Sequence, residues 1–278
     1  GAGSFALSNP GKSIITLAAD TTNSISYTSG TSFIIGTVTT SGLSSPGDIT
    51  LTALGAGDIT VSSNIQKTGS AAQTLTIQAN QNIVFNNGAD AGLASGATNN
   101  YNVVLNADRD ATAGGAIQVN TGTVINSNGG SITLGGGSNP LSTGAVGLGA
   151  LADGVLLDNA QLISGAGNIS IRGAGAASGG IGVSLANNST ITSTGTASIQ
   201  ITGTGTAGSS DIRLASGTNI IGGPNAAGDI LLNGTTGGGM VLGTGGDTAT
   251  IQTTGNITLN QAGGGVSQGS GVLLATGL

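Results

Sequence analysis

The chain has 278 residues and a formal net charge of −6, and only 6% of its residues are charged. It contains no cysteine and no histidine, which excludes a disulfide framework, a cysteine nucleophile, a histidine-containing zinc site and a Ser-His-Asp triad. The negative charge disfavours nucleic acid as a partner, because phosphates require lysine and arginine.

The composition favours β-structure throughout. Every acidic residue is an aspartate, so the glutamate that supports exposed helix surfaces is missing, and there are 54 glycines. Hydrophobic residues make up 37% of the chain but aromatic residues only 2%, so the core must consist of thin layers of aliphatic side chains. Regular apolar positions argue against disorder. The sequence contains no run of about 20 apolar residues, which is the length that a helix needs to span a membrane.

The N-terminal part of the chain predicts short strands at roughly ten-residue spacing. Their first inward residues are expected to be Ile15, Ile25, Ile35, Ile49, Ile59, Leu75, Ile83 and Val103. The phase of these positions is less regular than that of the residues that follow, so the coils are less well defined over 1–114.

A five-residue unit recurs along the chain. A small residue is followed by a residue such as aspartate, asparagine or serine, then an aliphatic, any residue and a second aliphatic. Its copies are Gly47–Leu51, Gly57–Val61, Gly115–Val119, Gly130–Leu134, Gly167–Ile171, Ser210–Leu214, Gly228–Leu232 and Gly255–Leu259. Each copy predicts a strand with two aliphatics facing inward, and the glycine is expected to supply a tight turn.

The spacing of these strands distinguishes a solenoid from a sandwich. The first inward residues form three columns, which are Val155, Val183, Ile212 and Val241, then Leu162, Ile191, Ile220 and Ile251, and finally Ile169, Ile199, Ile230 and Ile257. Steps within the columns are 27 to 31 residues long. Three columns at one period indicate three strands per coil, because a sandwich has no reason to keep three registers together.

One coil is longer than the others. Val155 follows Ile117 by 38 residues, and the surplus predicts an enlarged turn near 135–152 that projects from the rod. We therefore predict that residues 1–278 form a single right-handed parallel β-helix of about nine or ten coils. Its coils are regular, at about 29 residues each, over 115–278.

The sequence predicts no cap at either end of the solenoid. Residues Gly271–Leu274 resemble the first strand of a further coil, and no amphipathic or charged segment covers either open sheet edge. We expect the chain to be part of a longer rod or to associate with other copies through its ends.

Several stretches resemble the bacterial filamentous haemagglutinin-like exoproteins. They lie within 16–28, within 102–137 and in the repeats over 154–259. The resemblance implies a β-helical adhesin shaft, secreted or displayed at the bacterial surface and often exported through an outer-membrane partner. The family's secretion domain carries Asn-Pro-Asn motifs, whereas this chain has only Asn9-Pro10-Gly11 and Asn139-Pro140-Leu141, which favours the shaft.

Asp108, Arg109 and Asp110 form the densest charge cluster. Grouped carboxylates beside a basic residue are typical of sugar-cleaving sites on β-helices, so a carbohydrate-active lyase or hydrolase is the alternative function. No further carboxylate or lysine is expected at the same column in adjacent coils, which favours a solvated turn between the strands at Val103 and Ile117.

Two other patterns resemble known binding sites. Gly245-Gly246-Asp247 resembles one unit of a calcium-binding repeat but occurs once, which favours a turn. The pairs Thr50/Thr52 and Thr190/Thr192 suggest an ice-binding face, yet their uneven alignment favours ordinary β-surface. No catalytic residue, metal ligand or cofactor is assigned. The expected role is a structural or adhesive extracellular rod without enzymatic activity, with host or cell-surface glycans as candidate partners.

Overall fold

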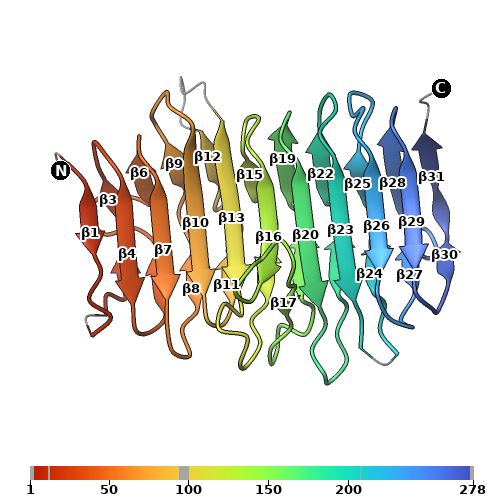
Figure 1. The fold of residues 1–278 in the computed structure, drawn as a ribbon, viewed down its shortest axis with the longest axis horizontal. Helices are drawn as coiled ribbons and strands as arrows, with labels where there is room; N and C mark the ends of the chain where they lie inside the picture. The colour runs from red at the N-terminus through yellow and green to blue at the C-terminus, as the bar shows by residue number, and fades with distance from the viewer. Residues whose placement is uncertain (1–2, 12, 94–99, 207, 276–278) are drawn as a thin grey trace.

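The computed structural model describes residues 3–11, 13–93, 100–206 and 208–275. They form 31 strands and no helix, arranged in three parallel sheets that run the length of the molecule (Figure 1). Each coil contributes one strand to each sheet in turn, and each sheet path holds ten strands. The predicted all-β solenoid with three strands per coil is confirmed. No membrane-spanning helix occurs in this part of the chain.

The strands of the three sheets follow one another in a fixed order. Sheet A contains β1 (Phe5–Leu7), β4 (Ile25–Ser29), β7 (Ile49–Ala53), β10 (Gln73–Ala79), β13 (Tyr101–Ala107), β16 (Ile132–Gly136), β20 (Ile169–Ala174), β23 (Ile199–Thr204), β26 (Ile230–Gly234) and β29 (Ile257–Gln261), with the short β17 (Ala145–Val146) paired to β20. Sheet B contains β2 (Thr16–Leu17), β5 (Phe33–Ile35), β8 (Ile59–Val61), β11 (Ile83–Phe85), β14 (Ile117–Val119), β18 (Val155–Asp158), β21 (Val183–Ala186), β24 (Ile212–Ala215), β27 (Met240–Leu242) and β30 (Val266–Gln268). Sheet C contains β3 (Ala19–Asp20), β6 (Leu43–Ser45), β9 (Ile65–Lys67), β12 (Ala91–Leu93), β15 (Val124–Asn126), β19 (Gln161–Gly165), β22 (Thr190–Ser193), β25 (Thr218–Gly222), β28 (Thr248–Thr253) and β31 (Ser270–Ala275).

The irregular phase of the N-terminal coils has a simple cause, which is that these coils are shorter. In sheet A, Ile25 pairs with Ile49, Ile49 with Leu75, Leu75 with Val103 and Val103 with Ile132. The steps are therefore 24, 26, 28 and 29 residues, so the coil length grows along the chain. A search for one constant period cannot align them.

Four inward positions were predicted wrongly. One is Val124, which the sequence predicts as inward between Ile117 and Ile132, although Ile125 of β15 enters the core. In β27 the inward residue is Met240, and Val241 faces outward opposite Arg213. In β25 it is Ile221, because Ile220 pairs with the outward Thr190. Two adjacent apolar residues leave the face undecided, and a shift of one residue reverses it.

The remaining error lies near the N-terminus. Ile15 is 80% exposed, whereas Leu17, two residues later, is 3% exposed and faces the core. Other predicted inward residues from Ile25 to Val103 are buried. Residues Gly271–Leu274, predicted as the first strand of a further coil, instead lie in β31 of sheet C and pair with β28, because β30 already provides the strand in sheet B.

The glycine of the five-residue unit has a different role from the one expected. A Cβ on Gly47 would lie 2.6 Å from the backbone nitrogen of Ser24, and one on Gly167 would lie 1.9 Å from the carbonyl oxygen of Gly130. Neither glycine has a left-handed backbone. Glycine is required here because the corners of consecutive coils touch, and not because the turn is tight.

The aspartate or asparagine after that glycine connects consecutive coils. The Asp58 Oδ1 accepts a hydrogen bond from the Asn82 backbone N–H at 2.9 Å, and the Asn82 Oδ1 accepts one from Ala116 at 2.9 Å. Sheet A corners repeat the pattern, since Asn168 accepts from Ser198 at 2.9 Å. The side chain thus satisfies an N–H group of the next coil, which the sheets themselves leave unpaired.

Asp211 is a buried carboxylate that ties three coils together. It is 0% exposed and precedes β24. Its Oδ1 accepts from the Gly205 N–H at 2.6 Å and from the Thr236 hydroxyl, and its Oδ2 accepts from the Gln261 Nε2 at 2.6 Å. Buried charge is tolerated where hydrogen bonds compensate it, as they do here.

Lys67 is an inward-facing lysine at the end of β9. It is 0% exposed, and its Nζ donates to the Gly69 carbonyl oxygen at 2.6 Å. Burial lowers the pKa of Lys67 from its ordinary value of 10.5. The folded state therefore disfavours the charged ammonium, and stability should increase as the pH rises from the lowered pKa towards 10.5.

We expect Lys67→Met to raise the Tm by a few degrees at neutral pH, because the buried ammonium is replaced by an apolar side chain of similar length. The gain in stability towards pH 10.5 should also become smaller than in the unmodified chain. Thermal unfolding followed by circular dichroism measures both effects, with the exposed neighbour Gln66→Met as the control. A Lys67→Met protein that melts earlier at neutral pH would contradict this account.

Candidate binding groove

The connection from β16 to β18 spans residues 137–154 and folds back along the rod. Its β17 joins sheet A, and Val146 forms an antiparallel bridge with Gly115 of the preceding coil. On the following coil, the Ala176 N–H donates to the Ala152 carbonyl oxygen at 2.7 Å. The projecting turn expected near 135–152 is therefore held against both neighbouring coils. We call residues 137–154 the inserted turn.

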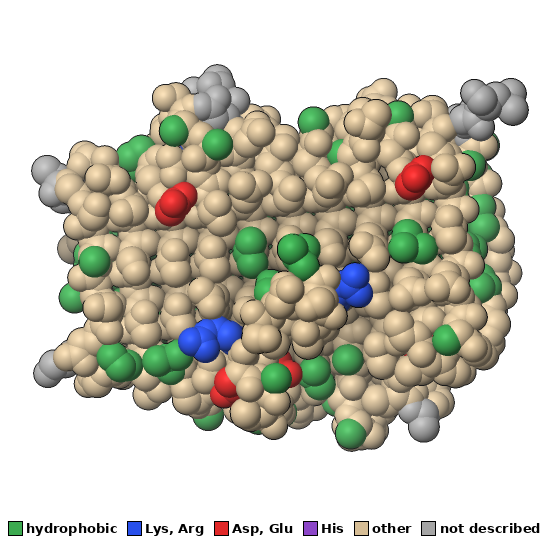
Figure 2. Space-filling view, viewed as in Figure 1, with side chains coloured by type: hydrophobic (Ala, Val, Ile, Leu, Met, Phe, Trp, Pro, Cys, Tyr) green, Lys and Arg blue, Asp and Glu red, His purple; other side chains and the backbone are tan. Residues whose placement is uncertain are grey.

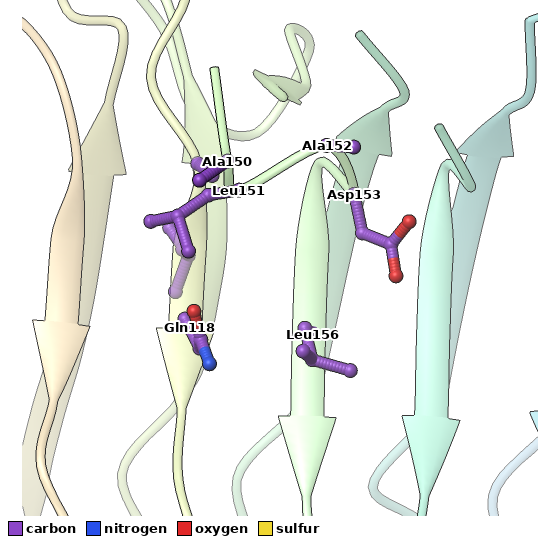
Figure 3. A pocket seen from close by; sticks show the side chains of 8 residues that line it. Gln118, Ala150, Leu151, Ala152, Asp153 and Leu156 are labelled. Atoms are coloured by element: carbon purple, nitrogen blue, oxygen red, sulfur yellow. The ribbon is translucent and has the colours of Figure 1, made fainter. Parts of the chain in front are cut away.

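The inserted turn borders a hollow on the outer face of sheet B (Figure 3). A cavity of about 250 Å³ lies there, lined by Ala116, Ile117, Gln118, Ala150, Leu151, Ala152, Asp153 and Leu156. A second cavity of about 380 Å³ continues over the next coils, lined by Asp153, Gly179, Gly180, Ile181, Gly208, Ser209, Ser210, Arg213, Val241 and Thr244. Asp153 belongs to both, and we call the combined surface the B groove.

The floor of the B groove is one column of outward residues from consecutive strands. Gln118 of β14 pairs with Leu156 of β18, Leu156 with Ser184 of β21, Ser184 with Arg213 of β24, and Arg213 with Val241 of β27. Gln118, Leu156 and Val241 are half-buried, Ser184 is buried and Arg213 is exposed. The column therefore combines amide, aliphatic, hydroxyl and guanidinium groups.

Two aspartates flank the guanidinium of Arg213. Burial raises the pKa of Asp153. The Ile181 N–H, which donates to Oδ1 at 2.9 Å, and the Arg213 charge partly offset this increase. The pKa of Asp247 is lowered by the Gly217 N–H, which donates at 2.9 Å, by other donors and by Arg213. The pKa values of the two carboxyl groups are thus shifted in opposite directions.

The two carboxylates stand too far apart to act on one glycosidic bond. Asp153 bonds to Ile181, before β21 begins, whereas Asp247 bonds to Gly217, after β24 has ended. Strands β21 and β24 pair side by side and have four residues each, which corresponds to roughly 13 Å along the strand. Glycosidases hold their carboxyl groups about 5–9.5 Å apart.

Asp153→Asn should leave the fold at least as stable at neutral pH. The asparagine keeps an oxygen for the Ile181 N–H and removes a charge that burial penalises. Because the folded pKa is raised, the unmodified chain should lose stability as the pH rises from 3.8 to that pKa, and the variant should lose less. Urea unfolding across this pH range gives the comparison, and a clearly weaker Asp153→Asn fold would refute the assignment.

Asp108, Arg109 and Asp110 lie in the turn after β13, but Asp108 is buried there and not solvated as expected. Asp108 is 4% exposed, has a φ of 48° and accepts a hydrogen bond from the Gly114 N–H at 3.1 Å. Burial, with a smaller effect of the Asp110 charge, raises the pKa of Asp108. The Asp108 carboxylate closes its own turn and does not line either cavity of the B groove.

The other two patterns also have local roles. Asp247, from Gly245-Gly246-Asp247, accepts from Gly217 and from the Thr244 hydroxyl at 2.9 Å. Within the described ranges no three acidic side chains gather as a metal site. The Thr50/Thr52 pair lies on sheet A and the Thr190/Thr192 pair on sheet C. Thr190 faces the same way as Gln161 and Ile220, so no regular threonine array continues there.

No protein-family model, no curated protein and no solved structure matches this chain. The chain is a β-solenoid repeat protein by its own geometry. The resemblance of its repeats to one family of exoproteins therefore supports only a proposal.

Sequence reasoning missed the grouping of Asp153, Arg213 and Asp247. They are separated by 60 and 34 residues, and only the strand register brings them to one face. One signal was present, because Arg213 is the outward residue of a five-residue unit, where most copies carry threonine or serine. Charged side chains are also rare on the face seen in Figure 2, which makes such a grouping unusual on this molecule.

Proposed function

We propose that this chain is a structural and adhesive rod belonging to a large secreted bacterial exoprotein. The observation that carries the proposal is the continuous stack of ten coils, tied from coil to coil by sheets and by side-chain hydrogen bonds. Such a unit contacts only its neighbours and can extend by repetition. The resemblance to filamentous haemagglutinin-like exoproteins supports an extracellular or cell-surface location.

A further coil would bury apolar surface at the C-terminal side of the stack. In β30 and β31, Val266 is 43% exposed, Val272 49% and Leu273 38%, although Leu273 pairs with the fully buried Ile251. We propose that this surface is covered by continuing chain or by a second copy. Electron microscopy of the purified chain tests the second case, for which end-to-end filaments are expected, while uniformly dispersed monomers would overturn it.

The adhesive role is tested separately. Beads coated with the chain should attach to cultured cells more often than beads coated with albumin, and removal of cell-surface glycans with glycosidases should reduce that attachment. Equal attachment of both bead types would overturn the adhesive part of the proposal and leave the rod unaffected.

A carbohydrate-active enzyme is the alternative. The opposite shifts in the pKa values of Asp153 and Asp247 support it, because the acid and the base of a catalytic pair typically have pKa values that are pushed apart. Their separation along the strands speaks against it, and we therefore propose that the chain is not an enzyme. Incubation with neutral and acidic polysaccharides is the test, and cleavage that disappears in Asp153→Asn and Asp247→Asn, or in Asp108→Ala and Asp110→Ala, would replace our proposal.

A further inference from the structure

We infer that the B groove binds an uncharged oligosaccharide along the rod axis, across the outward column from Gln118 to Arg213. The register places Gln118, Leu156, Ser184 and Arg213 on four consecutive strands of one parallel sheet. Adjacent strands lie about 4.8 Å apart, so the column extends over roughly 14 Å. This length suits a short chain of sugar rings better than a single small molecule.

The walls of the B groove are fixed before a ligand arrives. The Gly154 N–H donates to the Ile181 carbonyl oxygen at 2.9 Å, and the Asp153 Oδ1 accepts from the Ile181 N–H, so the inserted turn and the next coil hold each other in place. The Leu148 and Leu151 backbones bridge within the inserted turn itself. A preformed site loses little entropy on binding.

The side chains of the B groove match the two kinds of surface that a sugar presents. Leu151 and Leu156 line one cavity and offer aliphatic contact to the C–H face of a ring (Figure 3). Asp153 and Arg213 line the other cavity, where an acceptor and a forked donor lie close together. Neighbouring hydroxyl groups both donate and accept, so they can bond to both side chains at once.

The charge of the B groove disfavours an acidic ligand. Arg213 shares its cavity with the Asp153 carboxyl group, and the Asp247 carboxylate beyond the cavity also interacts with Arg213, so the guanidinium charge is offset within a chain of net charge −6. Acidic glycans, nucleic acids and anionic lipids would be repelled. The inference goes beyond the rod proposal and does not depend on it, because the B groove is complete within this chain whether or not the rod assembles further.

The test uses the full chain with defined hexasaccharides. Saturation-transfer NMR and calorimetry should detect binding of at least one of maltohexaose, cellohexaose and mannohexaose, and weaker or no binding of hexagalacturonate. Arg213→Ala and Leu156→Asp should each weaken binding by about tenfold or more, since one removes a charged donor and the other replaces an aliphatic contact with a charge. Thr60→Asp is the matched control, because Thr60 faces outward from β8 of the same sheet and lies away from the B groove. This variant should bind the hexasaccharide with unchanged affinity.

Absence of binding for all three neutral hexasaccharides would overturn the inference. So would equal affinity in the unmodified chain and both groove variants, or preferential binding of hexagalacturonate. Circular dichroism of each variant establishes that it is folded. The same samples examined by electron microscopy report on the rod independently, so failure of glycan binding and failure of filament assembly are separate results.

Discussion

Asp211→Ala is expected to lower the free energy of unfolding by about 4 kcal/mol, the largest effect we anticipate for a polar residue. The substitution removes the acceptor of the Gly205 N–H, the Thr236 hydroxyl and the Gln261 amide together. These groups belong to three successive coils, and the Asp211 carboxylate that joins them is 0% exposed. Thr236 and Gln261 are half-buried and also donate to the Gly205 and Thr236 carbonyl oxygens, so most of the loss should fall on the buried Gly205 N–H and on the link between coils. Each buried donor left without a partner costs about 1–3 kcal/mol.

Chemical denaturation followed by circular dichroism gives the overall loss, and hydrogen exchange shows where it occurs. Because repeat proteins can open locally, faster exchange should be concentrated in β23 to β29. Asp229→Ala is the matched control. Asp229 is exposed and also accepts from the next coil, at Asn256, so its removal should cost about 1 kcal/mol or less. Equal losses in both variants would show that burial of Asp211 is unimportant.

Gly167→Ala is expected to destabilise the chain by about 3 kcal/mol, although alanine normally favours a folded chain over glycine. The added methyl would lie 1.9 Å from the Gly130 carbonyl oxygen, which is backbone and cannot move without disturbing the coil below. The penalty comes from separating two coils that must touch, and not from an unfavourable φ.

Gly246→Ala provides the opposite expectation with the same chemical change. Gly246 has no left-handed backbone, and an added Cβ would meet nothing within 4 Å. The substitution should therefore be neutral or stabilise by about 0.5 kcal/mol, through the unfolded chain alone. Urea midpoints of the two variants decide the matter, and similar midpoints for both would remove close coil contact as the reason for glycine in the repeat.

The sequence was sufficient to predict the architecture because its information is local and repeated. The unit at Gly167–Ile171 shows which residues face inward, and its recurrence shows that three strands form a coil. The exact face of Met240 and Ile221 could not be predicted, because each lies beside another apolar residue and tertiary pairing decides which side chain enters the core.

The polar residues inside the rod and the B groove were beyond the reach of periodicity. Lys67 and Asp211 face inward because of hydrogen bonds that no pattern of apolar residues predicts. The B groove depends on the inserted turn folding back onto two coils, through contacts such as that between Val146 and Gly115. Both features arise from long-range pairing, which a one-dimensional repeat does not contain.

The ladder of corner side chains has a direction. At Asp58, Asn82 and Asn168, the oxygen of the earlier coil receives an N–H of the later one. At these corners a formed coil therefore offers side-chain acceptors to the N–H groups of the coil that follows it in the sequence. Removing C-terminal coils leaves these N–H groups of the remaining coils satisfied, whereas removing N-terminal coils takes their acceptors away. At these corners a later coil depends on the acceptors of the earlier one, whereas the Asp247 carboxylate, which accepts the Gly217 N–H, makes an earlier coil depend on a later one.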